Sequence, residues 1–489
     1  MLGKISVLQR CRSHSKNNVP LKLLAQINIL PTMKHQYKEH LEAMTAFFTA
    51  RTTQSLDFRM RQLVKLKTAI LHYENEINEA LFQDLRKSKE EVWASEIGLV
   101  LGEIKFAIKN LSRWMKPHQK MTNLLNFPSA SQVIAEPKGV VLIIAPWNYP
   151  FQLLMSPLVG AIAAGNCVVL KPSEHASATE KVMQQIIKTA FREDYVWYVT
   201  GDGATVIPSL MGGFKFDHVF YTGGTKVGTE IYKMAAEKLT PTTLELGGKS
   251  PCIITANANI AVAAKRIAFS KFSNAGQTCV APDYILVHES VKEDFIQALK
   301  KTTEQFYPKQ ERQAYGRIIN DKQFDRIVKY LDEGEVIYGG DTDKETLYIS
   351  PTIIDGVNTD MAIMQEEIFG PILPIITYTS AHDVMNVIRK NPDPLAFYIF
   401  TNNKREAIAW LAKVPSGGAC VNNCSLHVAN HHLPFGGRGN SGIGNYHGTF
   451  SFHTFSHQKS VLKSPTWFDP NAKYPPFEGK LGLLKKLMS

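Results

Sequence analysis

The sequence predicts an α/β protein with two doubly wound parallel sheets and a small bridging β-arm. Continuous apolar runs at 139–145 and 167–170 are closed by proline-containing turns, which is typical of strands buried on both faces of a parallel sheet. Segments with helical periodicity alternate with such runs on both sides of about residue 247. The 489 residues are enough for roughly two to four compact units.

Composition places the chain among ordinary globular proteins. Hydrophobic residues make up 44% and charged residues 20%, which argues against wholesale disorder, a collagen-like chain and a membrane-spanning bundle. The net charge is +11, but residues 1–32 and the segment from Lys459 to the end together carry +9 of it. The nearly neutral body between them argues against a nucleic-acid channel, so we expect no nucleic-acid partner.

The first 32 residues are expected to lie outside the fold. They contain basic residues and no acidic ones, which fits an organelle presequence, a disordered extension, or an upstream start codon for a chain that begins at Met33. The six cysteines form no disulfide framework. Since the sequence also lacks a secretory signal and an uninterrupted apolar run of ~18 residues, we predict a cytoplasmic protein.

The chain from residue 33 begins with helices. Apolar residues over 56–85 recur at mostly three, four or seven positions, which predicts amphipathic helix, and the same pattern predicts a helix over 97–111. After Pro117 the sequence becomes polar and alternating through 131–135. This segment is expected to form an extended arm or an edge strand.

The alternating elements then follow in two sets. Strands are predicted at 139–145, 167–170 and 218–221, with helices at 151–164 and 178–190 and a turn at 222–224; the second set begins with a strand at 252–254 and a helix at 260–272 and continues to about 425. We therefore divide the chain into four parts: an extension (1–32), a first domain (33–247, with its arm near 113–139), a second domain (248–430), and a C-terminal bridging segment with a basic tail (431–489).

Two residues are candidates for catalysis. Cys279 follows a predicted helix and Gly276, where backbone N–H groups are expected to lower its pKa and to hold an oxyanion beside it. The alternative for a lone cysteine is a small buried residue. Glu245 lies between apolar neighbours ahead of paired glycines, so desolvation is expected to raise its pKa toward that of a general base. Its alternative is a structural glutamate paired with Lys249.

Six ordered motifs resemble those of the aldehyde dehydrogenase superfamily, over about residues 40–475. They are Pro146–Trp147–Asn148–Tyr149–Pro150, Lys171–Pro172–Ser173–Glu174, Leu244–Glu245–Leu246–Gly247–Gly248–Lys249, Phe272 to Cys279, Glu366–Glu367–Ile368–Phe369–Gly370–Pro371, and Leu433–Pro434–Phe435–Gly436–Gly437. Residues 276–284 and 446–457 resemble the class 3-like branch that contains fatty aldehyde dehydrogenases. This resemblance implies Rossmann-like domains, an oligomerisation arm, NAD with NADP as an alternative, and a homodimer. Its substrates would be fatty, aromatic or terpenoid (apocarotenoid) aldehydes.

The resemblance also implies roles for single residues. Cys279 would attack the aldehyde carbonyl, while the Asn148 side-chain amide and the Cys279 N–H would stabilise the oxyanion. Glu245 would activate the water that hydrolyses the resulting thioester.

The same resemblance assigns the cofactor contacts. Lys171 and Glu174 would hold the adenine ribose, Glu367 would hold the nicotinamide ribose, and Phe369 would pack beside the nicotinamide ring. Glu174 would repel a 2′-phosphate and favour NAD. The remaining cofactor-binding candidates are Trp147, Leu246 and the turn that opens a helix toward the pyrophosphate, which comprises Gly223, Gly224, Thr225 and Gly228. The family often has serine at the position of Gly224, so one hydroxyl contact is expected to be missing.

Other features are open to two interpretations. Cys420 and Cys424 with neighbouring histidines suggest zinc, but their spacing is unlike a common zinc site and the resembling family has no metal there, so we expect none. Tyr149 and Phe269 are expected either to line an apolar substrate funnel or to pack in the core. The basic, apolar tail over 473–488 is interpreted either as a peripheral membrane contact or as a solvated terminus.

Two rival functions also remain. An acylating enzyme that releases its thioester to coenzyme A would not need the Glu245 base. A non-catalytic binding protein on the same scaffold is the other alternative.

Overall fold

The computed structural model describes residues 37–488, so the predicted extension over 1–32 lies outside the described residues. The N-terminal part is helical, as predicted: a helix over residues 37–49 precedes α2, α3, α4, a π-helical turn η2, and α5. The amphipathic segment 56–85 is divided at Tyr73 into two helices. The bounds are α2 (Leu56–His72), α3 (Glu74–Leu85), α4 (Lys89–Val92), η2 (Trp93–Ile97) and α5 (Gly98–Trp114).

The first sheet has six strands in the order β17-β7-β6-β3-β4-β5, and only β17 is antiparallel to its neighbour. Helices α6 to α9 connect its parallel strands, which confirms the doubly wound α/β prediction. The bounds are β3 (Val140–Ile144), α6 (Gln152–Ala164), β4 (Cys167–Lys171), α7 (Ser177–Ala190), β5 (Val196–Tyr198), α8 (Gly203–Gly213), β6 (His218–Thr222), α9 (Thr225–Ala236), β7 (Thr242–Glu245) and β17 (Gly442–Ile443).

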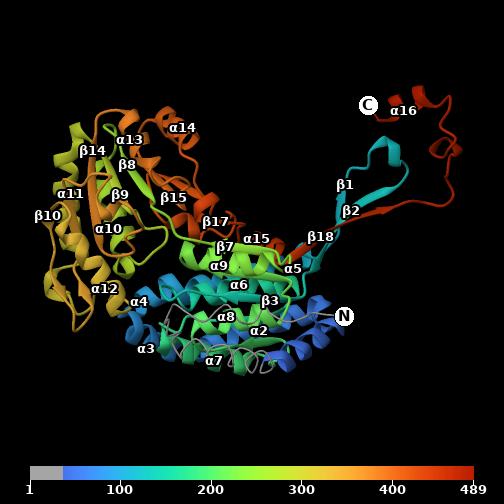
Figure 1. Ribbon diagram of the computed structural model, residues 1–489, viewed down its shortest axis with the longest axis horizontal. Coiled ribbons are helices and arrows are strands. Elements are labelled where there is room, and N and C mark those ends of the chain that lie inside the picture. The colour runs from blue at the N-terminus through green and yellow to red at the C-terminus, as the bar shows by residue number, and fades with distance from the viewer. Residues whose placement is uncertain (1–36, 489) are drawn as a thin grey trace, which may run out of the picture.

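The second sheet has seven strands in the order β10-β13-β14-β9-β8-β15-β16, and only β10 is antiparallel. The bounds are β8 (Pro251–Ile254), α10 (Ile260–Phe272), β9 (Tyr284–His288), α11 (Lys292–Phe306), α12 (Asp321–Val328), β10 (Glu335–Tyr338), β13 (Thr352–Asp355), β14 (Ile372–Tyr378), α13 (Ala381–Ile388), β15 (Ala396–Phe400), α14 (Lys404–Lys413) and β16 (Gly418–Val421). Figure 1 shows the two sheets as neighbouring bodies that are joined between β7 and β8.

A three-stranded antiparallel arm extends away from both bodies (Figure 1). It consists of β1 (His118–Lys120), β2 (Ala130–Pro137) and β18 (Ser456–Lys463), so the polar segment after Pro117 is extended as predicted. The chain beyond β18 returns to the tip of the arm, where α16 (Leu481–Met488) packs against the short helix η3 (Leu124–Asn126). Across residues 37–488, every helix is too short or too polar to cross a bilayer.

Strand order determines where a ligand can bind. In the first sheet the chain runs from β3 outward through β4 and β5, then returns to the other side of β3 with β6 and β7. The carboxyl ends of β3 and β6 therefore flank a topological switch point, which is where open α/β sheets bind nucleotides. The carboxyl end of β4, the loops that follow β3, β4, β6 and β7, and the start of α9 carry most of the residues predicted to bind the cofactor.

Candidate active site

The candidate nucleophile follows a tightly turned segment. Helix α10 ends at Phe272, and Asn274 and Ala275 then adopt left-handed backbone conformations with φ of 53° and 51°. Gly276 also has positive φ, and a side chain there would collide with the Gly370 carbonyl, since an added Cβ would lie 2.2 Å from that oxygen. Such strained backbone persists where the surroundings hold it in place, and it often marks functional sites. Cys279, three residues after this turn, lines the wall of a cavity.

The thiol of Cys279 is protonated at neutral pH. Its pKa is raised to about 12, chiefly by burial and to a lesser extent by the Glu367 and Glu245 carboxylates. The N–H groups of Cys279 and Val280 do lower the pKa, as expected from the sequence, but burial outweighs them, so the predicted net lowering is wrong. Both carboxyl groups are therefore near enough to Cys279 to influence its pKa.

Glu245 ends strand β7 in the interior of the molecule. Its side chain is buried, and within the described part of the chain neither carboxylate oxygen has a hydrogen-bond partner. Burial raises its pKa well above the ordinary value, which confirms the predicted direction. Lys249 is not its partner, because the Lys249 Nζ lies 2.6 Å from Asp283 Oδ2 instead. The structural alternative, a Glu245–Lys249 ion pair, is therefore wrong.

Asn148 lies in the loop after β3 and faces the nucleophile segment. Its side-chain Nδ2 donates a hydrogen bond to the Gln277 carbonyl at 2.9 Å, two residues before the cysteine. The neighbouring Tyr149 hydroxyl lies 2.7 Å from Thr278 Oγ1. Asn148 follows strand β3, Glu245 ends strand β7 and Cys279 follows helix α10, and hydrogen bonds join the Asn148 loop directly to the Cys279 segment.

A second group of predicted residues gathers at the end of β4. The buried Lys171 Nζ lies 3.1 Å from Glu174 Oε2, and the Gly203 N–H donates to Glu174 Oε1 at 3.1 Å. Burial raises the pKa of Glu174, but backbone hydrogen bonds and the Lys171 charge lower it more, so the net pKa is below the ordinary value. The Glu174 carboxylate is therefore charged at neutral pH and fixed in position, as a ligand for ribose hydroxyls requires.

The turn after β6 leaves room for a dinucleotide. Gly224 is exposed at the N-cap of α9, and a Cβ there would meet nothing within 4 Å. A Cβ on Gly228 would lie 2.6 Å from the Leu246 side chain, so the glycine allows α9 to pack closely on the strand. The first turn of α9 thus presents free backbone N–H groups beside open space, which suits a pyrophosphate.

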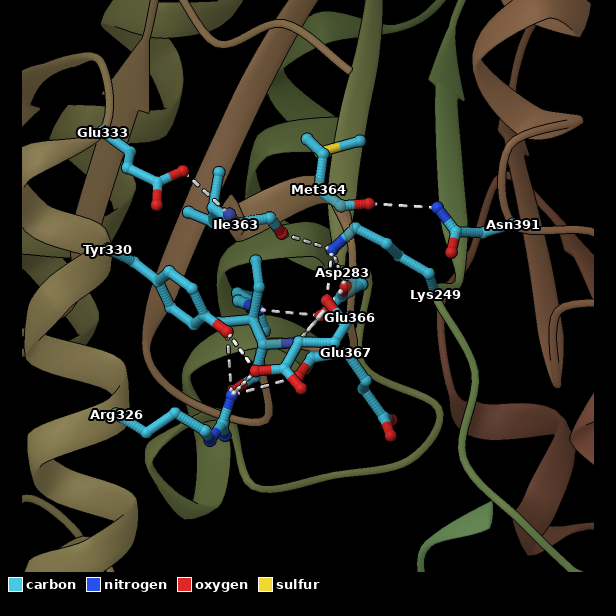
Figure 2. A network of polar contacts seen from close by, with 12 residues as sticks. Lys249, Asp283, Arg326, Tyr330, Glu333, Ile363, Met364, Glu366, Glu367 and Asn391 are labelled. Carbon is cyan, nitrogen blue, oxygen red and sulfur yellow. Dashed lines mark hydrogen bonds and ion pairs between the residues drawn. The ribbon is translucent and has the colours of Figure 1, made fainter. Parts of the chain in front are cut away.

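The loop that carries Glu367 is held from several sides (Figure 2). The Lys249 ammonium donates to the carbonyls of Ile363 and Glu366 at 2.7 and 2.9 Å. On the other side, Arg326 donates to the Ile368 carbonyl at 2.7 Å. Burial raises the pKa of Glu367 to about 8. In the same loop, the Phe369 ring packs edge to face against the Trp147 ring, with the ring centroids 5.3 Å apart.

Cys279 opens onto a cavity of about 560 Å³, a size suited to a small organic ligand. Aromatic rings form a continuous series along its lining, with centroid separations of 6.1 Å for Phe272–Tyr307, 5.2 Å for Tyr307–Tyr315 and 6.1 Å for Tyr315–Tyr348. Both Tyr149 and Phe269 line this cavity, which decides between their two interpretations. Phe269 is 50% exposed, so the apolar lining extends to the surface.

Several lining residues were not predicted. Tyr307, Tyr315, Tyr348 and the segment 425–431 reach the cavity from parts of the chain that are far apart, and no spacing in the sequence links them. Near this wall the Cys420 Sγ lies 3.4 Å from His427 Nδ1. Across residues 37–488, no three His, Cys, Asp or Glu side chains are grouped as metal ligands.

The fold and the site together define a class of enzyme, in which an open α/β nucleotide site lies beside a partly buried thiol in the wall of a substrate cavity. Comparisons with known proteins identify it further. Residues 24–461 match the model of the aldehyde dehydrogenase family. The chain is 47% identical to 4,4′-diaponeurosporen-aldehyde dehydrogenase of Staphylococcus aureus, over 90% of this chain and 96% of the relative. It is 41% identical to the dimeric NADP-preferring aldehyde dehydrogenase of Canis lupus familiaris, over 91% of this chain and 98% of the relative.

Solved structures agree with these relatives. A substrate-bound Staphylococcus aureus AldH superposes with a TM-score of 0.90 at 45% identity, covering 92% of this chain and 99% of that one. An indole-3-acetaldehyde dehydrogenase in complex with NAD⁺ superposes with a TM-score of 0.81 at 25% identity, covering 88% of this chain and 89% of that one. The chain belongs to the aldehyde dehydrogenase family. It is an NAD(P)-dependent enzyme that oxidises aldehydes.

Proposed function

We propose that the enzyme converts apolar aldehydes, of the fatty, aromatic or terpenoid (apocarotenoid) kind, to carboxylic acids. The observation that carries this proposal is the aromatic cavity that ends at Cys279. Its edge-to-face aromatic rings give the cavity an apolar lining, which favours long or conjugated chains by dispersion and apolar burial. The named substrate of the staphylococcal relative, a diaponeurosporen aldehyde, is of this kind.

Three residues carry the covalent chemistry in this proposal. The Cys279 thiol releases its proton to solvent as the sulfur adds to the carbonyl carbon, and this gives a thiohemiacetal alkoxide whose oxygen accepts hydrogen bonds from the Cys279 N–H and from Asn148. An amide NH₂ has two N–H groups, so Asn148 can bond both the Gln277 carbonyl and the substrate oxygen. Loss of hydride from carbon leaves a thioester on Cys279. Glu245 then removes a proton from the water that attacks the thioester, and the acid leaves as the thiol is restored.

The nicotinamide dinucleotide, when bound, supplies the acceptor for the hydride. Glu174, held by Lys171, would bind the adenine ribose, and Gly223, Gly224, Thr225 and Gly228 would form the pyrophosphate turn. Glu367, Phe369, Trp147 and Leu246 would surround the nicotinamide end. The charged Glu174 disfavours a 2′-phosphate, so NAD is the proposed preference.

We also propose the domain limits that these roles require. Residues 33–247, with an arm near 113–139, would form the cofactor domain, and residues 248–430 would form the catalytic domain. Residues 431–489 would then be the segment that returns to the arm. The position of β17 and β18 in the first sheet and in the arm supports this last assignment.

An acylating reaction is not favoured, because it has no step for Glu245. A coenzyme A acyl transfer regenerates the thiol with a second thiol rather than with water. The unpaired, buried Glu245 carboxylate beside the thiol has no use in that reaction. A non-catalytic binding protein would have no need of either group.

The substrate proposal is tested by kcat/KM for a series of aldehydes. Acetaldehyde, a medium-chain, a long-chain and a polyene aldehyde are compared by NADH formation, with NADP as the second cofactor. We expect kcat/KM to rise by about tenfold for every two methylenes that enter the cavity, at ~0.8 kcal/mol per buried CH₂, and to be higher with NAD. Equal kcat/KM across the series would contradict the apolar assignment.

We propose that two chains form a homodimer. Helix α9 exposes Val227 and Tyr232, which are 51% and 47% exposed, and Leu239 just beyond it is 85% exposed. We propose that these exposed apolar side chains, on α9 and just after it, belong to the interface between the two chains. Sedimentation velocity is expected to give twice the chain mass of 54.7 kDa at micromolar concentration, and a single-chain mass there would contradict the proposal.

We further propose a cytoplasmic enzyme whose tail contacts an anionic membrane surface. Trp467, Phe477 and Leu481 are 78%, 54% and 64% exposed, and lysines are interspersed with them at positions 473, 480, 485 and 486. Exposed aromatic and basic residues together favour the interface of an anionic bilayer, with about 1 kcal/mol from each nearby lysine.

Flotation with liposomes tests this contact. The full chain should float with vesicles that contain phosphatidylserine and should remain in solution with neutral vesicles. A chain that ends at Lys473 is the control and should not float with either. If the full chain also stays in solution with anionic vesicles, the tail is a solvated terminus.

A further inference from the structure

A buried lysine lies next to the oxyanion loop and has no assigned function. The Lys87 and Glu96 side chains are both fully buried, and Lys87 Nζ lies 2.6 Å from Glu96 Oε1. Burying an ion pair costs several kcal/mol per ion in desolvation, and well-packed apolar residues often replace such a pair without loss of stability. Stability alone therefore gives little reason for a lysine at this place.

The contacts of Lys87 show what it holds. Its ammonium donates to the backbone carbonyl of Asn148 at 3.1 Å and lies 4.0 Å from the centre of the Tyr149 ring. The other oxygen of Glu96 accepts the N–H of Gln152 at 2.8 Å, at the start of α6. The ion pair thus holds the short loop that carries Asn148 at its middle, through the Asn148 carbonyl, and at its end, through the Gln152 N–H.

The same carbonyl connects this loop to the nucleophile segment. Asn274 Nδ2 donates to the Asn148 carbonyl at 2.8 Å and to the Gln277 carbonyl at 3.2 Å. Asn274 itself is held in its left-handed conformation by a hydrogen bond from its N–H to Glu91 Oε1 at 2.8 Å. One backbone oxygen is therefore shared by Lys87 and by the turn that leads to Cys279.

We infer that Lys87, supported by Glu96, is a positioning residue that aims the Asn148 amide at the oxyanion formed on Cys279. This inference rests on the proposed roles of Asn148 and Cys279. Lys87 fixes the backbone of Asn148, while the Asn148 side chain makes the contact with substrate. A displacement of about 1 Å in such a donor can cost 10²-fold in rate.

The test compares the rate of the first NADH burst in wild type, Lys87→Met and Asn148→Ala. The burst reports the steps up to the thioester, which include the oxyanion. We expect Asn148→Ala to lower it by about 10²- to 10³-fold and Lys87→Met by about 10- to 100-fold. The Kd for NAD should change less than about twofold in both, because neither residue is assigned to the cofactor. Lys292→Met removes a partly buried ion pair with Asp355 outside the cavity and is the matched control, expected to keep the wild-type burst.

Alkylation of Cys279 by iodoacetamide separates positioning from general support of the fold. Alkylation needs the same sulfur but forms no oxyanion. The rate at the Cys279 peptide, followed by mass spectrometry without aldehyde, should therefore stay within about twofold of wild type in Lys87→Met. If the alkylation rate and the NADH burst rate fell together in Lys87→Met, Lys87 would support the whole loop, and the inference would be overturned.

A double variant guards against a folding defect in Lys87→Met, which leaves the buried Glu96 side chain without its cationic partner. Lys87→Met/Glu96→Gln removes both charges and keeps an oxygen for the Gln152 N–H. It should show the same loss of burst rate as the single variant. A burst at the wild-type rate in the double variant would overturn the inference about Lys87. It would leave the proposed function intact, because that function is tested by NADH formation in the wild-type enzyme.

Discussion

Replacement of Cys279 by alanine is expected to lower kcat for aldehyde oxidation by about 10⁴-fold or more. The sulfur is the group that bonds to the carbonyl carbon, and no other cysteine lines the cavity within the described residues. The side chain is partly buried and small, so its loss should leave the fold unchanged. Initial rates of NADH formation measure this effect.

Cofactor binding provides the control for this variant. The residues assigned to the dinucleotide lie at the carboxyl end of β4, in the loops after β3, β4, β6 and β7, at the start of α9, and in the loop held by Lys249. Cys279→Ala should therefore bind NAD with a Kd within about twofold of wild type. A steady-state rate near that of wild type in Cys279→Ala would show that Cys279 is not the nucleophile.

Replacement of Glu245 by glutamine is expected to separate the two half-reactions. The first NADH should form in a burst of about one per active site, after which turnover should stall at a rate lowered by about 10²- to 10⁴-fold. Glutamine keeps the shape of the side chain but cannot accept a proton from water. A full steady-state rate in Glu245→Gln would contradict its role as the base.

The pH dependence of wild type follows from the same residue. Burial favours the neutral form of Glu245 and raises its pKa well above the ordinary value. The base is active only when ionised, so hydrolysis of the thioester should decline as the pH falls through this raised pKa. The decline should therefore begin at a higher pH than an exposed glutamate would give, and Glu245→Gln should lose this step of the profile.

Much of the fold could be predicted from local pattern. The apolar runs at β3 and β4 and the helix α10 are found where the sequence predicts them, because full burial on both faces of a parallel sheet demands such runs. Strand β5 has only three residues, and α8 contains Pro208 and several glycines, so neither has a clear periodic signal. The break at Tyr73 also lies within an uninterrupted helical pattern.

The candidate site also has features that the sequence predicts and features that only the fold reveals. Cys279, Glu245 and Asn148 lie in short ordered motifs, and a sequence displays these directly. The net pKa of Cys279 depends on burial by distant segments, which local N–H groups do not reveal. Lys87 carries no pattern that distinguishes it from a surface lysine, since its partner carbonyl is supplied by the fold.

The most direct test of the proposed chemistry is to trap the acyl group on Cys279. Glu245→Gln is mixed with NAD and a long-chain aldehyde, quenched in acid after the burst, and analysed by intact mass and by peptide mapping. The proposed mechanism predicts one acyl group per active site, attached to the Cys279 peptide and absent when NAD is omitted. Full NADH formation with no adduct, or an adduct on a different residue, would contradict it.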